Sequence, residues 1–162
     1  MIFSEFSLTI DQFKTHPKSG RNIWLWNGDT DDLKRLLPLD ITSFLDIKSL
    51  SETASPKSKG DKDIANEINR ILSEELERIR SDNKPPHILL VTGCYLLARY
   101  NTGLATLFNY HVGNGIATIM VVPIVKRKIE MPAYINYDPN FTLSYLTSLL
   151  GIENAIEVNA NG

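Results

Sequence analysis

The sequence predicts an α/β fold: a three-layer sandwich in which helices cover both faces of a mostly parallel sheet of four or five strands. The apolar run His87–Thr92 ends in a Thr-Gly turn, and the amphipathic stretch Cys94–His111 follows it. A second apolar run, Gly115–Val125, comes next. A strand, a helix and a strand in that order form a parallel βαβ unit, in which ligands usually lie where strands end.

The N-terminal third supplies the first strand and two short helices. Thr9–Gln12 has capping-box spacing and predicts a short helix that ends at His16-Pro17. Ile23–Asn27 is rich in large apolar residues and predicts the first strand. The turn residues Gly28–Asp32 then favour a helix over Asp31–Leu37, which Pro38 stops.

A second strand and the longest helix follow. Ile41–Ile47 predicts a strand with Phe44 and Leu45 at its centre. The segment 51–62 holds almost nothing apolar and predicts a mobile surface loop. Asp63–Ser81 predicts a helix, because six apolar residues recur in it at spacings of three and four.

The remaining elements complete the sheet. His87–Thr92 and Gly115–Pro123 predict two strands joined by the amphipathic helix that begins after Gly93. The β-branched run Ile116–Val125 is typical of a strand buried on both faces. Ile129–Tyr137 is an expected edge strand, and Phe141–Leu150 an expected last helix. We expect one domain over residues 1–152 and a loose tail over 153–162.

Composition excludes several classes of protein. With 17 basic and 19 acidic residues the net charge is −2, which does not favour a protein that coats nucleic acid. Cys94 is the only cysteine, so an internal disulfide and a multi-thiolate zinc site are excluded. No apolar run approaches the ~20 residues that cross a bilayer. We therefore expect a cytoplasmic protein that meets nucleic acid only indirectly and has no membrane contact.

The segment after the first strand argues against ordinary nucleotide binding. A phosphate loop needs several glycines, whose backbone N–H groups surround phosphate, and a lysine for the terminal phosphates. Asn27–Asp32 has one glycine, three aspartates and no lysine. The sequence is compatible with a degenerate P-loop-like core that has lost its phosphate loop, and it predicts no cofactor.

Asp29, Asp31 and Asp32 have two interpretations. Carboxylates crowded at a strand end can hold Mg²⁺, as in metal-dependent nucleases. The same residues also suit the first turn of a helix, which is the favoured interpretation. A metal site needs a carboxylate from a second strand end, where the third strand offers Thr92 instead. No metal ligand or catalytic residue is therefore assigned.

Other residues are expected to contact a ligand or a partner. Arg99 lies among apolar residues on the helix after the third strand, where it either pairs with an aspartate of the 29–32 group or extends to solvent. We expect Trp24 and Trp26 to face opposite sides of their strand, so that at least one is exposed to a protein partner. Cys94 is expected to be a buried small apolar residue rather than a nucleophile.

Two stretches are similar to the BrxB family of bacteriophage-exclusion (BREX) defence systems. One is the strand, acidic turn, helix and strand of Ile23–Ile47. The other is Ile88–Gly93 followed by Tyr95–Arg99, Leu104–Phe108 and a strand that ends at Pro123. The family tends to be longer, and it has Tyr-Pro-Gly where this chain has Val-Val-Pro-Ile124.

The resemblance implies a small accessory subunit of an antiviral defence system, without enzymatic activity, that assembles with larger defence proteins. A PglZ-like phosphatase-related component is the expected partner, and self-association stays open. Two alternatives remain. One is a small metal-dependent hydrolase or nuclease that uses Asp29, Asp31 and Asp32. The other is a nucleotide-sensing module.

Overall fold

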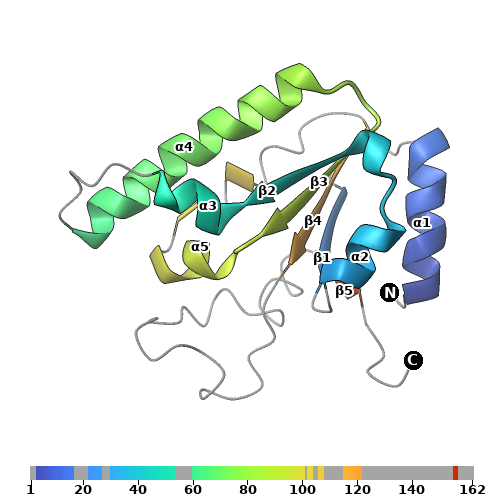
Figure 1. Cartoon of the computed structure of the whole chain (residues 1–162), viewed down its shortest axis with the longest axis horizontal. Coiled ribbons are helices and arrows are strands. Elements are labelled where there is room, and N and C mark those ends of the chain that lie inside the picture. Colours follow the sequence, from blue (N-terminus) through green and yellow to red (C-terminus); the bar gives the residue numbers. More distant parts are fainter. Residues whose placement is uncertain are drawn as a thin grey trace, which may run out of the picture.

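The computed structural model describes residues 3–16, 22–26, 30–53, 60–100, 102–103, 106–107, 115–121 and 155–156. Helices and strands alternate along most of this length (Figure 1). The elements are, in chain order, α1 (Phe3–Thr15), β1 (Asn22–Trp26), α2 (Thr30–Leu36), the 3₁₀ helix η1 (Leu39–Ile41), β2 (Thr42–Asp46), α3 (Ile47–Glu52), α4 (Asp61–Asp82), β3 (His87–Thr92), α5 (Tyr95–Tyr100), β4 (Ile116–Val121) and β5 (Ala155–Ile156).

The strands form one parallel sheet in the order β2-β3-β4-β1-β5. β4 lies between β3 and β1, with Met120 in register with Val91 on one side and with Leu25 on the other. The chain therefore crosses from β1 to the far edge of the sheet before it returns through β3 and β4. The predicted α/β class with a parallel sheet is confirmed.

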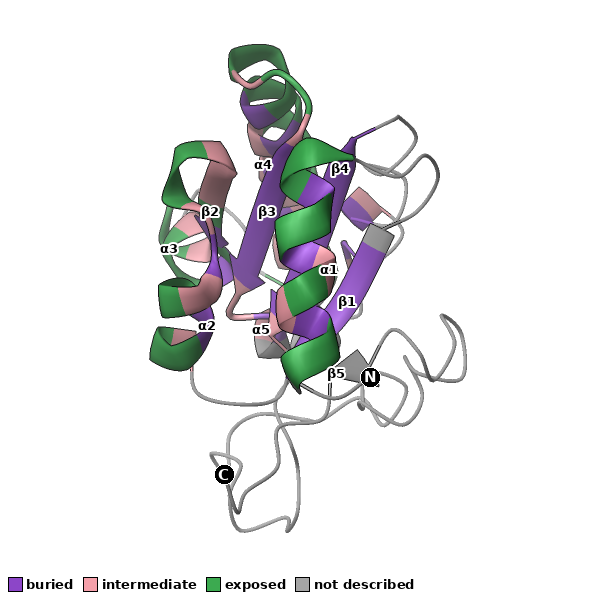
Figure 2. Ribbon diagram, turned by 90° about the vertical axis from the view of Figure 1, so that its right-hand side faces the viewer, coloured by how far each residue is buried: buried purple, intermediate pink, exposed green. Residues whose placement is uncertain are grey.

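Alternate residues of each inner strand pack into two separate cores, as the period of two in a strand requires. In β3, Leu89 and Val91 pack on the side of α4, whereas Ile88 and Leu90 pack on the side of α1 and α2. Figure 2 shows α1 and α2 on one face of the sheet and α4 on the other. Within the described residues, the sheet is the middle of three layers.

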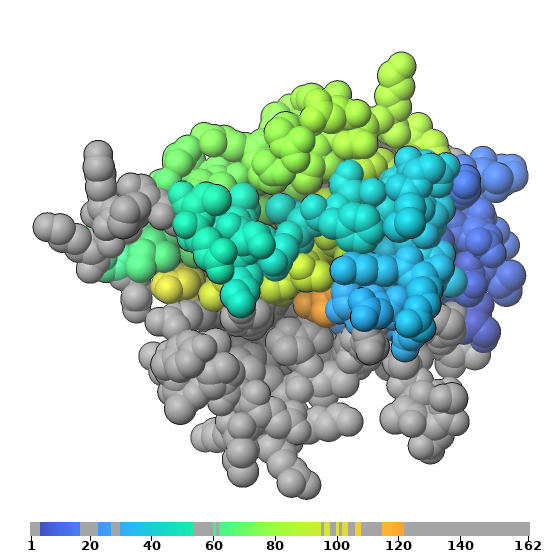
Figure 3. Space-filling model, in the orientation of Figure 1, coloured from blue at the N-terminus to red at the C-terminus, as the bar shows by residue number. Residues whose placement is uncertain are grey.

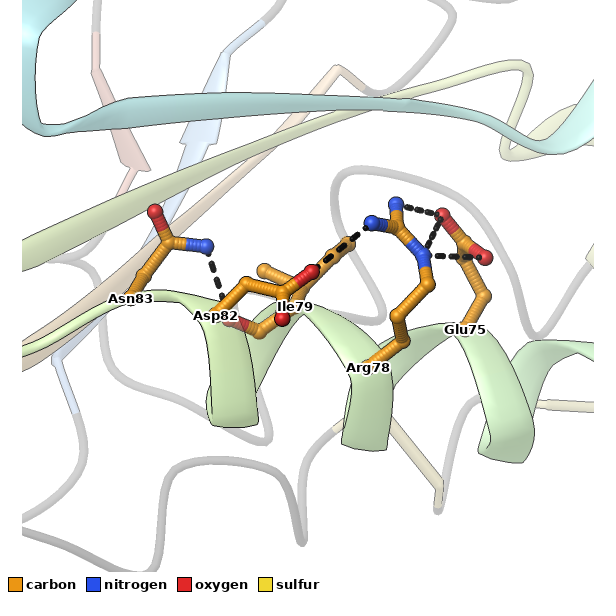
Figure 4. Close-up of polar contacts among 5 residues, drawn as sticks. All are labelled: Glu75, Arg78, Ile79, Asp82 and Asn83. Atoms are coloured by element: carbon orange, nitrogen blue, oxygen red, sulfur yellow. Dashed lines mark hydrogen bonds and ion pairs between the residues drawn. The ribbon is translucent and has the colours of Figure 1, made fainter.

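The helix α4 covers one face of the sheet with an apolar stripe. Its buried residues follow helical spacing, as predicted: Ile68, Leu72, Leu76 and Ile79. Ion pairs line its solvent side, where Arg78 contacts both Glu75 and Asp82 (Figure 4). Exposed pairs at these spacings each stabilise a helix by only about 0.2–0.5 kcal/mol. The outer side of α4 is therefore a solvated surface.

The predicted start of α1 is wrong. The helix begins at Phe3, six residues before Thr9, and the Thr9 hydroxyl donates to the Glu5 carbonyl one turn earlier instead of capping. The apolar side of α1 is formed by Phe6, Ile10 and Phe13, all buried. This helix is longer than its capping signal predicted because three aromatic and aliphatic anchors hold it to the sheet.

The prediction for the two tryptophans is also wrong. Trp24 and Trp26 stand two residues apart and so share a face of β1, and both are buried against α1. The Phe6 ring lies 5.9 Å from Trp24 and 6.3 Å from Trp26 between centroids. Leu25, between them, packs into the opposite core. Neither tryptophan is available to a partner.

The helix predicted over residues 94–111 is interrupted. α5 ends at Tyr100, and Gly103 takes a positive φ of 81°. A Cβ at that glycine would lie 2.9 Å from side-chain atoms of both Leu72 and Leu97. Glycine is therefore the residue that fits this position, where the chain leaves the helical conformation close to α4 and α5.

The other expected elements differ in part from the structure. The helix α3 was not predicted, and it takes up the first residues of the expected 51–62 loop. Because α4 starts at Asp61, the segment between the two helices is residues 53–60, of which 54–59 lie outside the described residues. The expected edge strand 129–137 and last helix 141–150 also lie outside them. In the expected tail, Ala155 and Ile156 pair with β1 as β5 rather than standing apart.

Candidate functional site

The carboxyl ends of β2 and β3 form the best-defined polar site at the edge of the sheet where the strands end. All the strand pairs are parallel, so every strand ends at this edge, which is where α/β proteins usually bind ligands. Asp46 and Thr92 are the last residues of their strands and stand in register. Gly93 follows Thr92 and leads into α5.

The Asp46 carboxylate accepts hydrogen bonds from three donors. The Lys48 backbone N–H reaches Oδ1 at 3.2 Å, and the Ser49 hydroxyl reaches Oδ2 at 2.9 Å. The Thr92 hydroxyl donates to Oδ1 at 3.2 Å across the strand pair. Asp46 is thus the N-cap of α3 and also ties the end of β2 to the end of β3.

These contacts control the charge of Asp46. Partial burial raises the pKa of the carboxyl, but the hydrogen bonds from Ser49, Lys48 and Thr92 together outweigh it and lower the pKa below the ordinary value. The carboxylate is therefore ionised at neutral pH. Three of its about four acceptor positions are used by α3 and by Thr92 of the neighbouring strand.

Gly93 allows the turn after β3 to sit directly on α3. Its φ is +72°, a region that favours glycine. A Cβ there would lie 2.9 Å from both Asp46 Oδ1 and the Lys48 backbone nitrogen. The Thr-Gly pair of the sequence is thus explained by close backbone approach to the Asp46 turn.

Cys94 is buried beside this site, as expected. Burial raises the pKa of its thiol to about 12, so the thiol stays protonated at neutral pH. Its Sγ lies 3.8 Å from the Val91 carbonyl, to which it can donate. A neutral, buried thiol is not a nucleophile.

The acidic residues of α2 stand elsewhere at this edge. Asp31 and Asp32 are exposed in the first turn of the helix, and Asp32 pairs with Arg35 at 3.2 Å. Asp29 lies outside the described residues. Among the residues that the structure describes, no three histidine, cysteine or carboxylate side chains are grouped to hold a metal ion.

Of the remaining residues expected to contact a ligand or a partner, the structure places one in this site. Thr92 belongs to the site, with Asp46 as its partner. The backbone of Arg99 lies in α5, but its side chain is outside the described residues. Asp46 was missed, although Asp46-Ile-Lys-Ser49 has N-cap spacing, because the predicted strand ran on to Ile47 and concealed the start of α3.

Comparisons with known proteins add no relative to these observations. No protein-family model, no curated protein and no solved structure matches the chain. Across the described ranges, no helix combines the length and the apolar character needed to span a bilayer.

Proposed function

We propose that this chain is a non-enzymatic accessory subunit that works by binding larger proteins of a bacterial anti-phage defence system. One observation carries the non-enzymatic part: the polar groups at the carboxyl ends of β2 and β3 bind one another. Asp46 accepts from Lys48, Ser49 and Thr92, all within its own turn or the neighbouring strand.

This arrangement is poorly suited to catalysis. A general base or a metal ligand needs free lone pairs directed at a substrate or an ion. Three hydrogen bonds from α3 and Thr92 occupy most of the about four acceptor positions of the Asp46 carboxylate and fix its orientation within the fold. Cys94 is buried with its proton retained, so it offers no alternative nucleophile. The site stabilises the fold, and binding of other proteins is left as the activity.

The defence assignment is supported by the BrxB resemblance of the two strand-helix-strand stretches, and the sheet is compatible with it. We further propose a P-loop-like core without its phosphate loop. β1 lies inside the sheet, and residues 27–29 lead from it into α2, which is the place of the phosphate loop in such proteins. Those residues have a single glycine, Gly28, and no lysine, where a phosphate loop has several glycines and a lysine.

Co-assembly tests the proposal. The chain is purified with and without a PglZ-like protein encoded in the same genomic neighbourhood, and molar masses are measured by size-exclusion chromatography with light scattering. We expect one peak with the summed mass of both proteins. The PglZ-like protein mixed with an unrelated α/β protein of similar size is the control. A strict monomer that ignores its neighbour contradicts the proposal.

A further inference from the structure

We propose that the outer edge of β2 is a strand-addition site, at which an extended segment of a partner protein carrying an acidic residue beside an apolar one pairs with Thr42–Asp46. The inference rests on the proposed function in one respect, that the chain has a protein partner. It adds the surface and the chemistry of the segment that binds there.

The first support is the open edge. β2 ends the strand order and pairs with β3 on its inner side. In the part of the chain that the structure describes, the Thr42 backbone N–H donates to the Leu39 carbonyl and the Thr42 hydroxyl to the Pro38 carbonyl, and the remaining hydrogen bonds lie in the Asp46 turn. The main-chain groups of Ser43–Asp46 are the ones left for an added strand. Alternate N–H and C=O groups of an edge strand point away from the sheet and can pair with another strand.

The position of β2 on the molecule agrees with this. β2 is the strand nearest the viewer in Figure 1, and in the space-filling view it reaches the surface between α3 and α2 (Figure 3). The strand has five residues, enough for several main-chain hydrogen bonds to an added strand. β2 is therefore exposed at the surface on the side seen in these views.

The second support is an aromatic side chain on this strand. Phe44, at the centre of β2, keeps 50% of its surface exposed, whereas Leu45 beside it is buried in the core. Natural edge strands are usually protected by charge, proline or a bulge, because an apolar edge invites pairing. A half-exposed phenylalanine is an anchor of the type that dominates binding energy when a partner covers it.

The third support is the charge next to Phe44. Lys34 of α2 holds its ammonium 5.7 Å from the centre of the Phe44 ring. The next cation along α2, Arg35, has an acidic partner in Asp32. Among the described residues no carboxylate forms an ion pair with Lys34, which leaves it complementary to an acidic side chain of the added segment.

This charge also selects between two occupants. If a second copy of the chain paired antiparallel about a two-fold axis at Phe44, each Phe44 would bring its own Lys34 to the same side of the joined sheet. The two ammonium groups would then repel each other. An extended acidic and apolar segment of a different protein fits the surface better.

Selection from a random 12-residue peptide display library, with the full chain as bait, tests the proposal. Enriched peptides should lack proline and share an acidic residue next to an apolar one. Phe44→Lys and Lys34→Glu should each weaken their binding about tenfold or more. Leu8→Lys, on a leucine of α1 that is 62% exposed, is the matched control and should change it less than about twofold.

Two further measurements test the binding mode. Thermal melts must show that each variant is folded. If Phe44→Lys does not fold, Lys34→Glu tests the surface in its place. Backbone N-methylation of an enriched peptide at one set of alternate residues should abolish binding, and at the other set should leave it, because only alternate N–H groups meet β2. Equal loss for both sets contradicts strand addition.

Other outcomes overturn the proposal as stated. These are an absence of enriched peptides, peptides without acidic residues, and peptides that bind Phe44→Lys as tightly as the natural chain. A dimer dispersed by Phe44→Lys shows that a second copy occupies the edge. If the PglZ-like protein co-assembles equally with Phe44→Lys, the proposed function stands and this surface is wrong. If peptides bind β2 but the PglZ-like protein does not co-assemble with the chain, this surface is correct and the proposed function is wrong.

Discussion

Thr92 and Thr118 lie on neighbouring strands, but only Thr92 has a partner for its hydroxyl. Thr92 donates to Asp46, whereas Thr118 is fully buried in β4 and its Oγ1 has no hydrogen-bond partner in the described structure. An unsatisfied buried hydroxyl costs about 1–3 kcal/mol of desolvation, while a satisfied one contributes about 1 kcal/mol. The same residue type therefore has opposite effects on stability at these two positions.

Valine at each position tests this difference. Thr118→Val removes the unpaired hydroxyl and keeps the shape, so we expect the free energy of unfolding to stay equal or rise by about 1 kcal/mol. Thr92→Val removes a hydrogen bond to Asp46 and should lower it by about 1 kcal/mol. Urea unfolding at neutral pH measures both. A clear loss of stability in Thr118→Val would show that the hydroxyl has a partner.

His87 is a second buried polar residue without full satisfaction. Its Nε2 has no hydrogen-bond partner among the described groups, and burial lowers the pKa of the imidazole, although a hydrogen bond with the Ile41 backbone opposes the shift. The folded protein therefore keeps the ring neutral at a pH where the same histidine in the unfolded chain, with a pKa of about 6.5, begins to bind a proton.

This shift predicts a loss of stability in mild acid. The unfolded state binds more protons as pH falls through about 6.5, so the free energy of unfolding decreases until the lower folded pKa is reached. Measurements from pH 8 to pH 5 should show this decrease, and His87→Asn should reduce its slope. His16→Gln, at an exposed histidine, is the matched variant with which the slope of His87→Asn is compared. An unaltered slope in His87→Asn contradicts the prediction.

At the scale of the elements, Gly93 joins three of them. It follows the last residue of β3, begins the turn into α5 and lies against the first turn of α3. Its positive φ is strained for any residue with a side chain. An added Cβ would also lie only 2.9 Å from atoms of Asp46 and Lys48, so a larger residue would require the turn to rearrange. The relative position of α3 and β3 thus depends on this glycine.

Gly93→Ala should therefore destabilise the protein by about 1–3 kcal/mol, because backbone strain and a steric clash add. Gly60→Ala is the matched control. Gly60 is the N-cap of α4, its φ is −143°, and a Cβ there would meet nothing within 4 Å. We expect the control to change the free energy of unfolding by less than about 1 kcal/mol. Chemical denaturation compares the two, and equal effects would contradict the close approach.

At the scale of the whole molecule, the two alternative functions predict ligands that stabilise the fold. A ligand at ~100 times its dissociation constant adds about 2.7 kcal/mol to the free energy of unfolding. Because the polar groups at the β2 and β3 ends bind each other, we expect no thermal shift with Mg²⁺, Mn²⁺, ATP, GTP or cyclic nucleotides. A shift that disappears in Asp31→Asn or Asp32→Asn would instead support the metal-dependent alternative.

Most of the described elements could be predicted from the sequence, because their signals are local. β1, β3, β4 and α4 have their periodicity in adjacent residues, and proline and glycine mark where several elements end. The period of two in a strand also places Trp24 and Trp26 on one face of β1. The prediction that they face opposite sides was therefore a misinterpretation of a pattern that the sequence contains.

Only the tertiary structure decided the strand order, the break at Gly103 and the candidate site. Thr92 and Asp46 are 46 positions apart in the chain, and their hydrogen bond exists because β2 and β3 are neighbours in register. Likewise, the backbone at Gly103 lies so close to Leu72, which is 31 positions away in the chain, that an added Cβ would clash with it. A residue's own periodicity depends on its neighbours in sequence, whereas its partners depend on how distant segments bury their apolar surfaces together.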